Sequence, residues 1–122
     1  MTIPTPAQSR GRLAEDRALN FLEEQGLRLL ERNFRCRYGE VDLIMEDGLT
    51  LVFVEVRFRA SQRFGGALES VDRRKQSKLL VTAAWFLKDR RYDRPARFDV
   101  AALSPSADGL AVQWVKDAFQ AG

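Results

Sequence analysis

The chain has 122 residues, of which 45% are hydrophobic and 30% are charged, with 20 basic against 17 acidic side chains. This composition is typical of a soluble globular protein, and the length fits one domain but is too short for two ordinary domains. The chain contains no His, which excludes Ser-His-Asp and Cys-His catalysis and His-ligated zinc. Carboxylates, Lys, Tyr and a hard cation remain as sources of chemistry.

The N-terminal residues give no sign of export or of membrane insertion. Residues 1–8 contain two prolines and no apolar periodicity, so they are expected to form a flexible tail. The first residues lack the apolar region of a signal peptide, and no apolar run approaches the roughly 18 residues that span a bilayer. We therefore expect a cytoplasmic protein. The single Cys36 cannot form an internal disulfide and is expected to be an ordinary strand residue.

The apolar periodicity predicts two helices and five strands. The first helix, at 9–25, ends at Gly26. The other elements follow in chain order as strands at 27–37, 40–46 and 50–58, a helix at 71–89, and strands at 96–103 and 110–119. Asp47-Gly48 is typical of a two-residue hairpin, and Ser70 is the expected N-cap of the second helix. The order α-β-β-β-α-β-β predicts an α/β fold with helices covering a sheet.

Charged residues interrupt the two hairpin strands, which are otherwise apolar on both faces and therefore expected to be central. Alternation places Asp42 near Glu55 on one face, with Arg57 beside Glu55. Two such carboxylates suit Mg²⁺, which is commonly held by one or two carboxylates and keeps several waters. The alternative is structural, because Arg57 could simply form salt bridges with both acids.

Both predicted helices carry a polar residue on the apolar side. Glu15 is in line with Ala18 and Leu22, and Gln76 is in line with Leu79 and Leu80. These side chains could converge with the strand charges on one pocket, or each could reach solvent at the edge of its helix.

Basic residues are concentrated between positions 57 and 97, where twelve Lys or Arg stand against four acidic residues, a net charge of +8. Such a segment suggests a polyanionic partner such as nucleic acid, although a solvated basic surface is the simpler alternative. The side chains expected to contact phosphates are Arg59, Arg63, Arg73, Arg74, Lys75 and Lys78.

These residues together resemble a known family. An acid on one hairpin strand followed by Glu-x-basic on the next resembles the core of PD-(D/E)xK nucleases. The segments "GRLAEDRALNFL", "RNFRCRYGEVDLI", "LVFVEVRFR", "VDRRKQSKLLVTAAWFL" and "RFDVAAL" resemble the YraN family of small bacterial proteins. That family is similar to archaeal Holliday-junction resolvases and other restriction-endonuclease-like proteins.

The resemblance implies a single restriction-endonuclease-like domain over residues 9–119, with a mixed sheet flanked by helices and a C-terminal tail at 120–122. It implies that Asp42 and Glu55 bind Mg²⁺ or Mn²⁺, with Glu15 as the acid of the first helix. Arg57 would stand in the place of the usual catalytic Lys. Lys75 and Gln76 would be supporting residues, and the similarity to dimeric resolvases raises a homodimer as one arrangement.

Arg57 is the departure from the motif. Arg stays protonated and cannot serve as a base, whereas it can still stabilise a phosphorane-like transition state or clamp a phosphate. Three hypotheses follow: a Mg²⁺-dependent endonuclease acting on DNA, including branched DNA; a nucleic-acid-binding module that does not cleave; and a structural or partner-binding protein with internal ion pairs.

Overall fold

The computed structural model describes residues 6–59 and 71–120, with side chains described from residue 11 onward. Two helices and five strands follow the predicted order: α1 (Pro6–Glu24), β1 (Arg28–Cys36), β2 (Gly39–Asp47), β3 (Thr50–Phe58), α2 (Arg73–Asp89), β4 (Ala96–Ser106) and β5 (Gly109–Phe119). The predicted α/β fold class is confirmed. No helix in the described part of the chain is long and apolar enough to cross a membrane.

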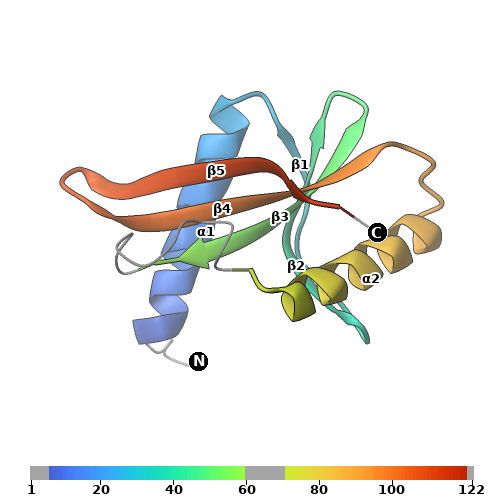
Figure 1. Ribbon diagram of the computed structural model, residues 1–122. Helices are drawn as coiled ribbons and strands as arrows, with labels where there is room; N and C mark the ends of the chain where they lie inside the picture. The colour runs from blue at the N-terminus through green and yellow to red at the C-terminus, as the bar shows by residue number, and fades with distance from the viewer. Residues whose placement is uncertain (1–5, 60–70, 121–122) are drawn as a thin grey trace, which may run out of the picture.

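The five strands form one mixed sheet in the order β1-β2-β3-β4-β5 (Figure 1). The β3–β4 pair is parallel and the other three pairs are antiparallel. The β2–β3 hairpin closes on the Asp47–Thr50 pair, so its two loop residues are Gly48 and Leu49. Gly48 has φ +61°, the backbone conformation that such turns require. Both hairpin strands are interior strands of the sheet, as predicted.

Each face of the sheet is covered by one helix (Figure 1). On one face, α1 buries Ala14, Ala18 and Leu22 against residues of β2, β3 and β4. On the other face, α2 buries Leu79, Ala83 and Phe86 in a second cluster, which includes Phe34 and Phe53 of the sheet. The continuous apolar runs of β3 serve both clusters, because its successive side chains point to opposite faces.

The helix boundaries differ from the prediction at two points. α1 begins at Pro6, which suits a first helical turn because proline lacks the N–H that would be unpaired there. The N-cap of α2 is Asp72, whose carboxylate accepts a hydrogen bond from the backbone N–H of Lys75 at 2.9 Å. The prediction that Ser70 is the N-cap is therefore wrong, and Ser70 itself lies outside the described residues.

Candidate functional site

The β2–β3 ladder stops one residue short of the two predicted acids. Its last pair is Leu43–Val54, so Asp42 and Glu55 are the next residues in register. In place of a further ladder bond, the backbone N–H of Val56 donates to Asp42 Oδ2 at 2.8 Å. The Asp42 side chain therefore occupies the point at which the two strands separate.

Asp42 is held in an environment that disfavours its ionised form. Burial is the largest cause, followed by the negative charge of Glu55, and together they raise the pKa of Asp42 to about 7. A hydrogen bond to Glu55 and the charge of Glu15 act in the same direction, while the Val56 N–H bond opposes them. The predicted proximity of Asp42 and Glu55 is thus present in the structure, whereas Glu15 acts on Asp42 only through its charge.

The two strand acids line cavities on opposite faces of the sheet. Asp42 lines a small cavity of about 150 Å³ on the α1 side, together with Glu15 and Val56. Glu55 lines a cleft of about 570 Å³ on the α2 side. The prediction that they share one face is therefore wrong. Because the ladder ends before them, their carboxylates interact through the gap between the strands.

The cation that contacts Glu55 comes from the helix. Lys75 Nζ lies 3.3 Å from Glu55 Oε1, and the Glu55 side chain is only 8% exposed while that of Lys75 is 40% exposed. Among the described residues, no hydrogen bond or ion pair joins Arg57 to Asp42 or Glu55. The alternative in which Arg57 neutralises both acids is therefore not the arrangement found.

Glu15 lies where the helix periodicity placed it, on the inner side of α1. It receives hydrogen bonds of 3.0 Å from both Arg32 Nε and Asn33 Nδ2. Asn33 has φ +53°, in the left-handed region, and its side chain reaches Glu15 of α1. Within residues 11–59 and 71–120, no three acidic or Cys side chains are grouped closely enough to ligate one metal ion directly. Direct ligation would therefore fall to Asp42 and Glu55.

Gln76 is half-buried, and its Nε2 donates to the carbonyl oxygen of Val71 at 2.9 Å. This bond ties the first turn of α2 to the residue that precedes its N-cap. Gln76 is not among the side chains that line the cleft. Its predicted supporting role stays a prediction.

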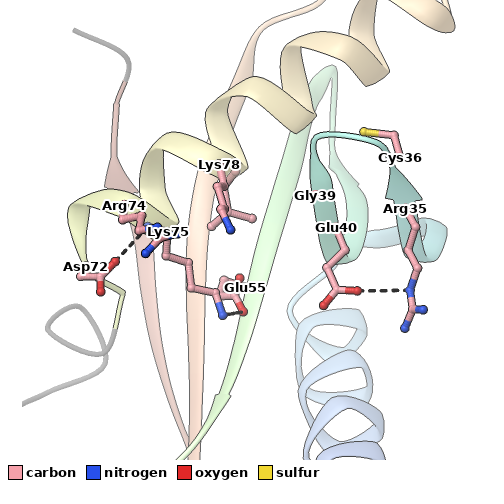
Figure 2. Close-up of a pocket in the computed structure, with 10 residues that line it drawn as sticks. Arg35, Cys36, Gly39, Glu40, Glu55, Asp72, Arg74, Lys75 and Lys78 are labelled. Atoms are coloured by element: carbon pink, nitrogen blue, oxygen red, sulfur yellow. Dashed lines mark hydrogen bonds and ion pairs between the residues drawn. The ribbon is translucent and has the colours of Figure 1, made fainter.

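The cleft has two walls, which Figure 2 shows on either side of Glu55. One wall is the first two turns of α2, and the other is the end of the β1–β2 hairpin, from which Arg35 pairs with Glu40 at 3.1 Å. The walls meet where Gly39, with φ +154°, packs on α2: a Cβ at this position would lie 2.8 Å from Thr82 Oγ1. Glycine is therefore needed here for both conformation and space.

Four basic side chains line the cleft, namely Arg35, Arg74, Lys75 and Lys78. Three of them were predicted as phosphate contacts, whereas Arg35 was not, because only the docking of α2 brings β1 to the same cleft. Arg73 is exposed at the start of α2 outside the cleft lining, and Arg59 donates its backbone N–H to Leu103 O at 2.7 Å. Arg63 lies outside the described residues.

A second buried acid was not identified from the sequence. Asp99 of β4 has no exposed surface. It accepts hydrogen bonds from Arg97 Nε at 3.1 Å, Trp114 Nε1 at 3.0 Å and the Asp117 N–H at 2.9 Å. Arg97 in turn pairs with Asp47 at 2.8 Å. Every charge in this cluster has a partner, which is the behaviour of a structural site.

Comparison with known proteins gives a consistent result. Residues 14–103 match the family described as Uncharacterised protein family UPF0102. A UPF0102 protein of Methylococcus capsulatus is 50% identical over 111 residues, which are 91% of this chain and 90% of that protein. A UPF0102 protein of Stutzerimonas stutzeri is 52% identical over 116 residues, covering 93% of this chain and 97% of that protein. The chain with this paired-acid site therefore belongs to the UPF0102 family.

Proposed function

We propose that this protein binds nucleic acid and hydrolyses its phosphodiester bonds with the help of a divalent cation, as PD-(D/E)xK nucleases do. The observation that carries the proposal is the apposition of Asp42 and Glu55 at the gap between two central strands. Like charges placed together in a protein interior are costly unless something relieves them. A bound cation between them would provide that relief.

The residues present suit Mg²⁺ or Mn²⁺ better than a metal that needs a full protein cage. Two carboxylates are the usual protein contribution to a Mg²⁺ site, with waters and substrate oxygens completing the shell. Glu55 Oε1 already forms an ion pair with Lys75 Nζ, which shows that a cation is stable beside this oxygen. Glu15 would act through water, because it is not grouped with Asp42 and Glu55 closely enough to share a metal ion directly, and its Oε1 already accepts from Arg32 and Asn33.

The chain's own groups would bind and orient the substrate. A bound cation would activate water and offset the charge that develops on the phosphate. The Val56 N–H fixes Asp42 Oδ2 in position, so this carboxylate cannot rotate freely. Lys75 and Lys78 would hold phosphate oxygens in the cleft, and Arg57 would contribute charge but no base.

The second candidate is a nucleic-acid-binding module that does not cleave. The residue that favours it is Arg57, which stands where the nuclease motif has Lys. Both candidates share the basic cleft, so only a cleavage assay separates them.

The test is a panel of labelled linear, flapped and four-way DNA substrates, incubated with wild-type protein and Mg²⁺ or Mn²⁺. We expect cleavage of at least one substrate that EDTA abolishes. Asp42→Asn and Glu55→Gln should each lower the cleavage rate at least 100-fold while retaining the wild-type circular dichroism spectrum. Asp93→Asn, which changes an exposed acid outside the cleft lining, is the matched control.

Binding without cleavage of any substrate would overturn the nuclease assignment and leave the binding module. Absence of binding to DNA and RNA would overturn both candidates.

A further inference from the structure

The α2-side cleft is too small for a double helix, yet it contains the acid of the proposed site. Its volume of about 570 Å³ lies within the range of pockets that enclose a small molecule, roughly 300–1,000 Å³. Glu55 is recessed in it, with 8% of its side chain exposed, behind the more exposed Lys75. A phosphate that reaches Glu55 must therefore enter between α2 and the β1–β2 hairpin.

The charge of the cleft favours a chain of phosphates. Arg35 is paired with Glu40, and Lys75 with Glu55. Arg74 and Lys78 line the cleft without an ion-pair partner among the described residues. They are four positions apart on α2, which places them on one side of the helix on the order of 6 Å apart. Such a pair suits successive phosphates of one strand.

The residues that line the cleft also indicate whether the protein would contact the bases of a bound strand. Among the described residues, those that line the cleft include four basic and three acidic side chains and no aromatic ring. Single-strand binders that hold bases in place do so by stacking them on aromatic side chains. Because the described part of the lining offers charged groups and no such ring, we expect contacts to the sugar-phosphate backbone to dominate and binding to be insensitive to sequence.

We infer that the cleft between α2 and the β1–β2 hairpin holds one unpaired nucleic-acid strand by its phosphates, so that the substrate must be single-stranded or locally opened at the site. The inference rests on the proposed function and deepens it by naming the substrate class. Arg74 and Lys78 hold the strand, and Lys75 contacts the phosphate nearest Glu55. An intact duplex would meet the exposed mouth without entering.

The chain contains one Cys, and it lies in this cleft. Cys36 therefore reports occupancy directly. The rate at which a maleimide modifies Cys36 would be measured in EDTA, with and without a 12-nucleotide poly-dT strand or a blunt duplex of equal length. We expect the strand to slow modification at least fivefold and the duplex to leave it nearly unchanged. Cys36→Ser identifies any reaction at other groups.

Fluorescence anisotropy with the same oligonucleotides gives an independent measurement. Lys78→Gln should weaken strand binding about tenfold and lower the dependence of log K on log salt by about 0.7, the value for one lost phosphate contact on a single strand. Lys88→Gln makes the same change at an exposed position in the last turn of α2, outside the cleft lining, and should have little effect.

The outcomes separate this inference from the proposed function. Equal binding of strand and duplex, with equal protection of Cys36, would overturn the single-strand inference and leave nucleic-acid binding intact. Tight binding that neither protects Cys36 nor responds to Lys78→Gln would show that the strand lies elsewhere. A wild type that binds neither oligonucleotide would overturn the proposed function itself.

Discussion

Two acids of the sheet have opposite surroundings: Asp99 of β4, which is fully buried, and Asp42 of β2, which is partly buried. Asp99 is enclosed by three donors, one of them the guanidinium of Arg97. Asp42 has one backbone donor, and the two charged side chains that act most strongly on its pKa, Glu55 and Glu15, are both acidic. At Asp99 a fully paired charge connects the strands. At Asp42 the carboxylate is repelled by the neighbouring carboxylate of Glu55. Burial of an acid alone therefore does not indicate a functional site, whereas an acid held beside another acid is the arrangement on which the proposed function rests.

The largest effect is expected where the charge is fully satisfied. Asp99→Ala would remove one of the two acidic partners of Arg97, which would keep only Asp47, and would leave the Trp114 Nε1–H and the Asp117 N–H unpaired. Breaking a buried pair typically costs about 3–5 kcal/mol. Urea unfolding should show a loss of that size in the free energy of unfolding. Asp93→Ala, at an exposed position, should stay within about 0.5 kcal/mol of wild type. A loss below 1 kcal/mol at Asp99 would refute the structural assignment of this cluster.

Removing the charge of Asp42 should raise the free energy of unfolding, the opposite of the effect expected at Asp99. Its pKa in the folded protein is about 7 against an ordinary 3.8, so the folded state binds more protons between those pH values. The free energy of unfolding should therefore fall as pH rises from about 4 to 7, by about 2–4 kcal/mol. Asn at this position can accept from the Val56 N–H and donate to Glu55, as a protonated Asp does. Asp42→Asn should thus be more stable than wild type at pH 8 and lose most of this pH dependence. An Asp42→Asn protein that is less stable than wild type at pH 8 would show that ionised Asp42 is not destabilised by burial and by Glu55.

A divalent cation should relieve the repulsion between the Asp42 and Glu55 carboxylates. At ten times its Kd, a ligand that binds only the folded state adds about 1.4 kcal/mol to its stability. We expect Mg²⁺ to raise the Tm of wild type at pH 8 by a few degrees, relative to NaCl at matched ionic strength. Glu55→Gln should abolish that shift. An identical shift in both proteins would place cation binding elsewhere.

The smallest stability effect is expected for Lys75→Gln. The Lys75–Glu55 pair has one partner that is 40% exposed, and ion pairs that reach solvent contribute about 0–1 kcal/mol. Urea unfolding should therefore show a change below 1 kcal/mol, although binding of a nucleic-acid strand should weaken. A loss above 2 kcal/mol would show that Lys75 is chiefly a structural partner of Glu55.

Much of the fold could be predicted because its signals are local. The alternation of β3, the turn at Gly48 and the stripe of α1 each follow from a few adjacent residues. The proximity of Asp42 and Glu55 also followed, since a hairpin fixes which residues face one another. Their placement toward opposite faces did not, because it depends on where the ladder stops.

The partners of the site depend on tertiary docking, which local patterns do not encode. Lys75 was predicted as a phosphate contact, yet its pairing with Glu55 follows from the angle at which α2 packs on the sheet. Arg35 enters the cleft for the same reason. Asp99 shows the same sequence pattern as Asp42, because each is a charged residue within an otherwise apolar strand. Only the surroundings of each, with donors around one and an acid beside the other, separate their roles.

The contact between Gly39 and Thr82 sets the spacing of the cleft walls without involving any charged residue. A methyl group at position 39 would lie 2.8 Å from Thr82 Oγ1, so either the Thr82 side chain or α2 itself would have to shift to admit it. Residue size at positions 39 and 82 therefore acts as a spacer that can be changed in small steps. Replacing Thr82 by Ala would give the wall room to approach, and enlarging position 39 would push it back. The width of strand that the protein accepts could thus be selected by evolution, or by an engineer, while its chemistry stays untouched.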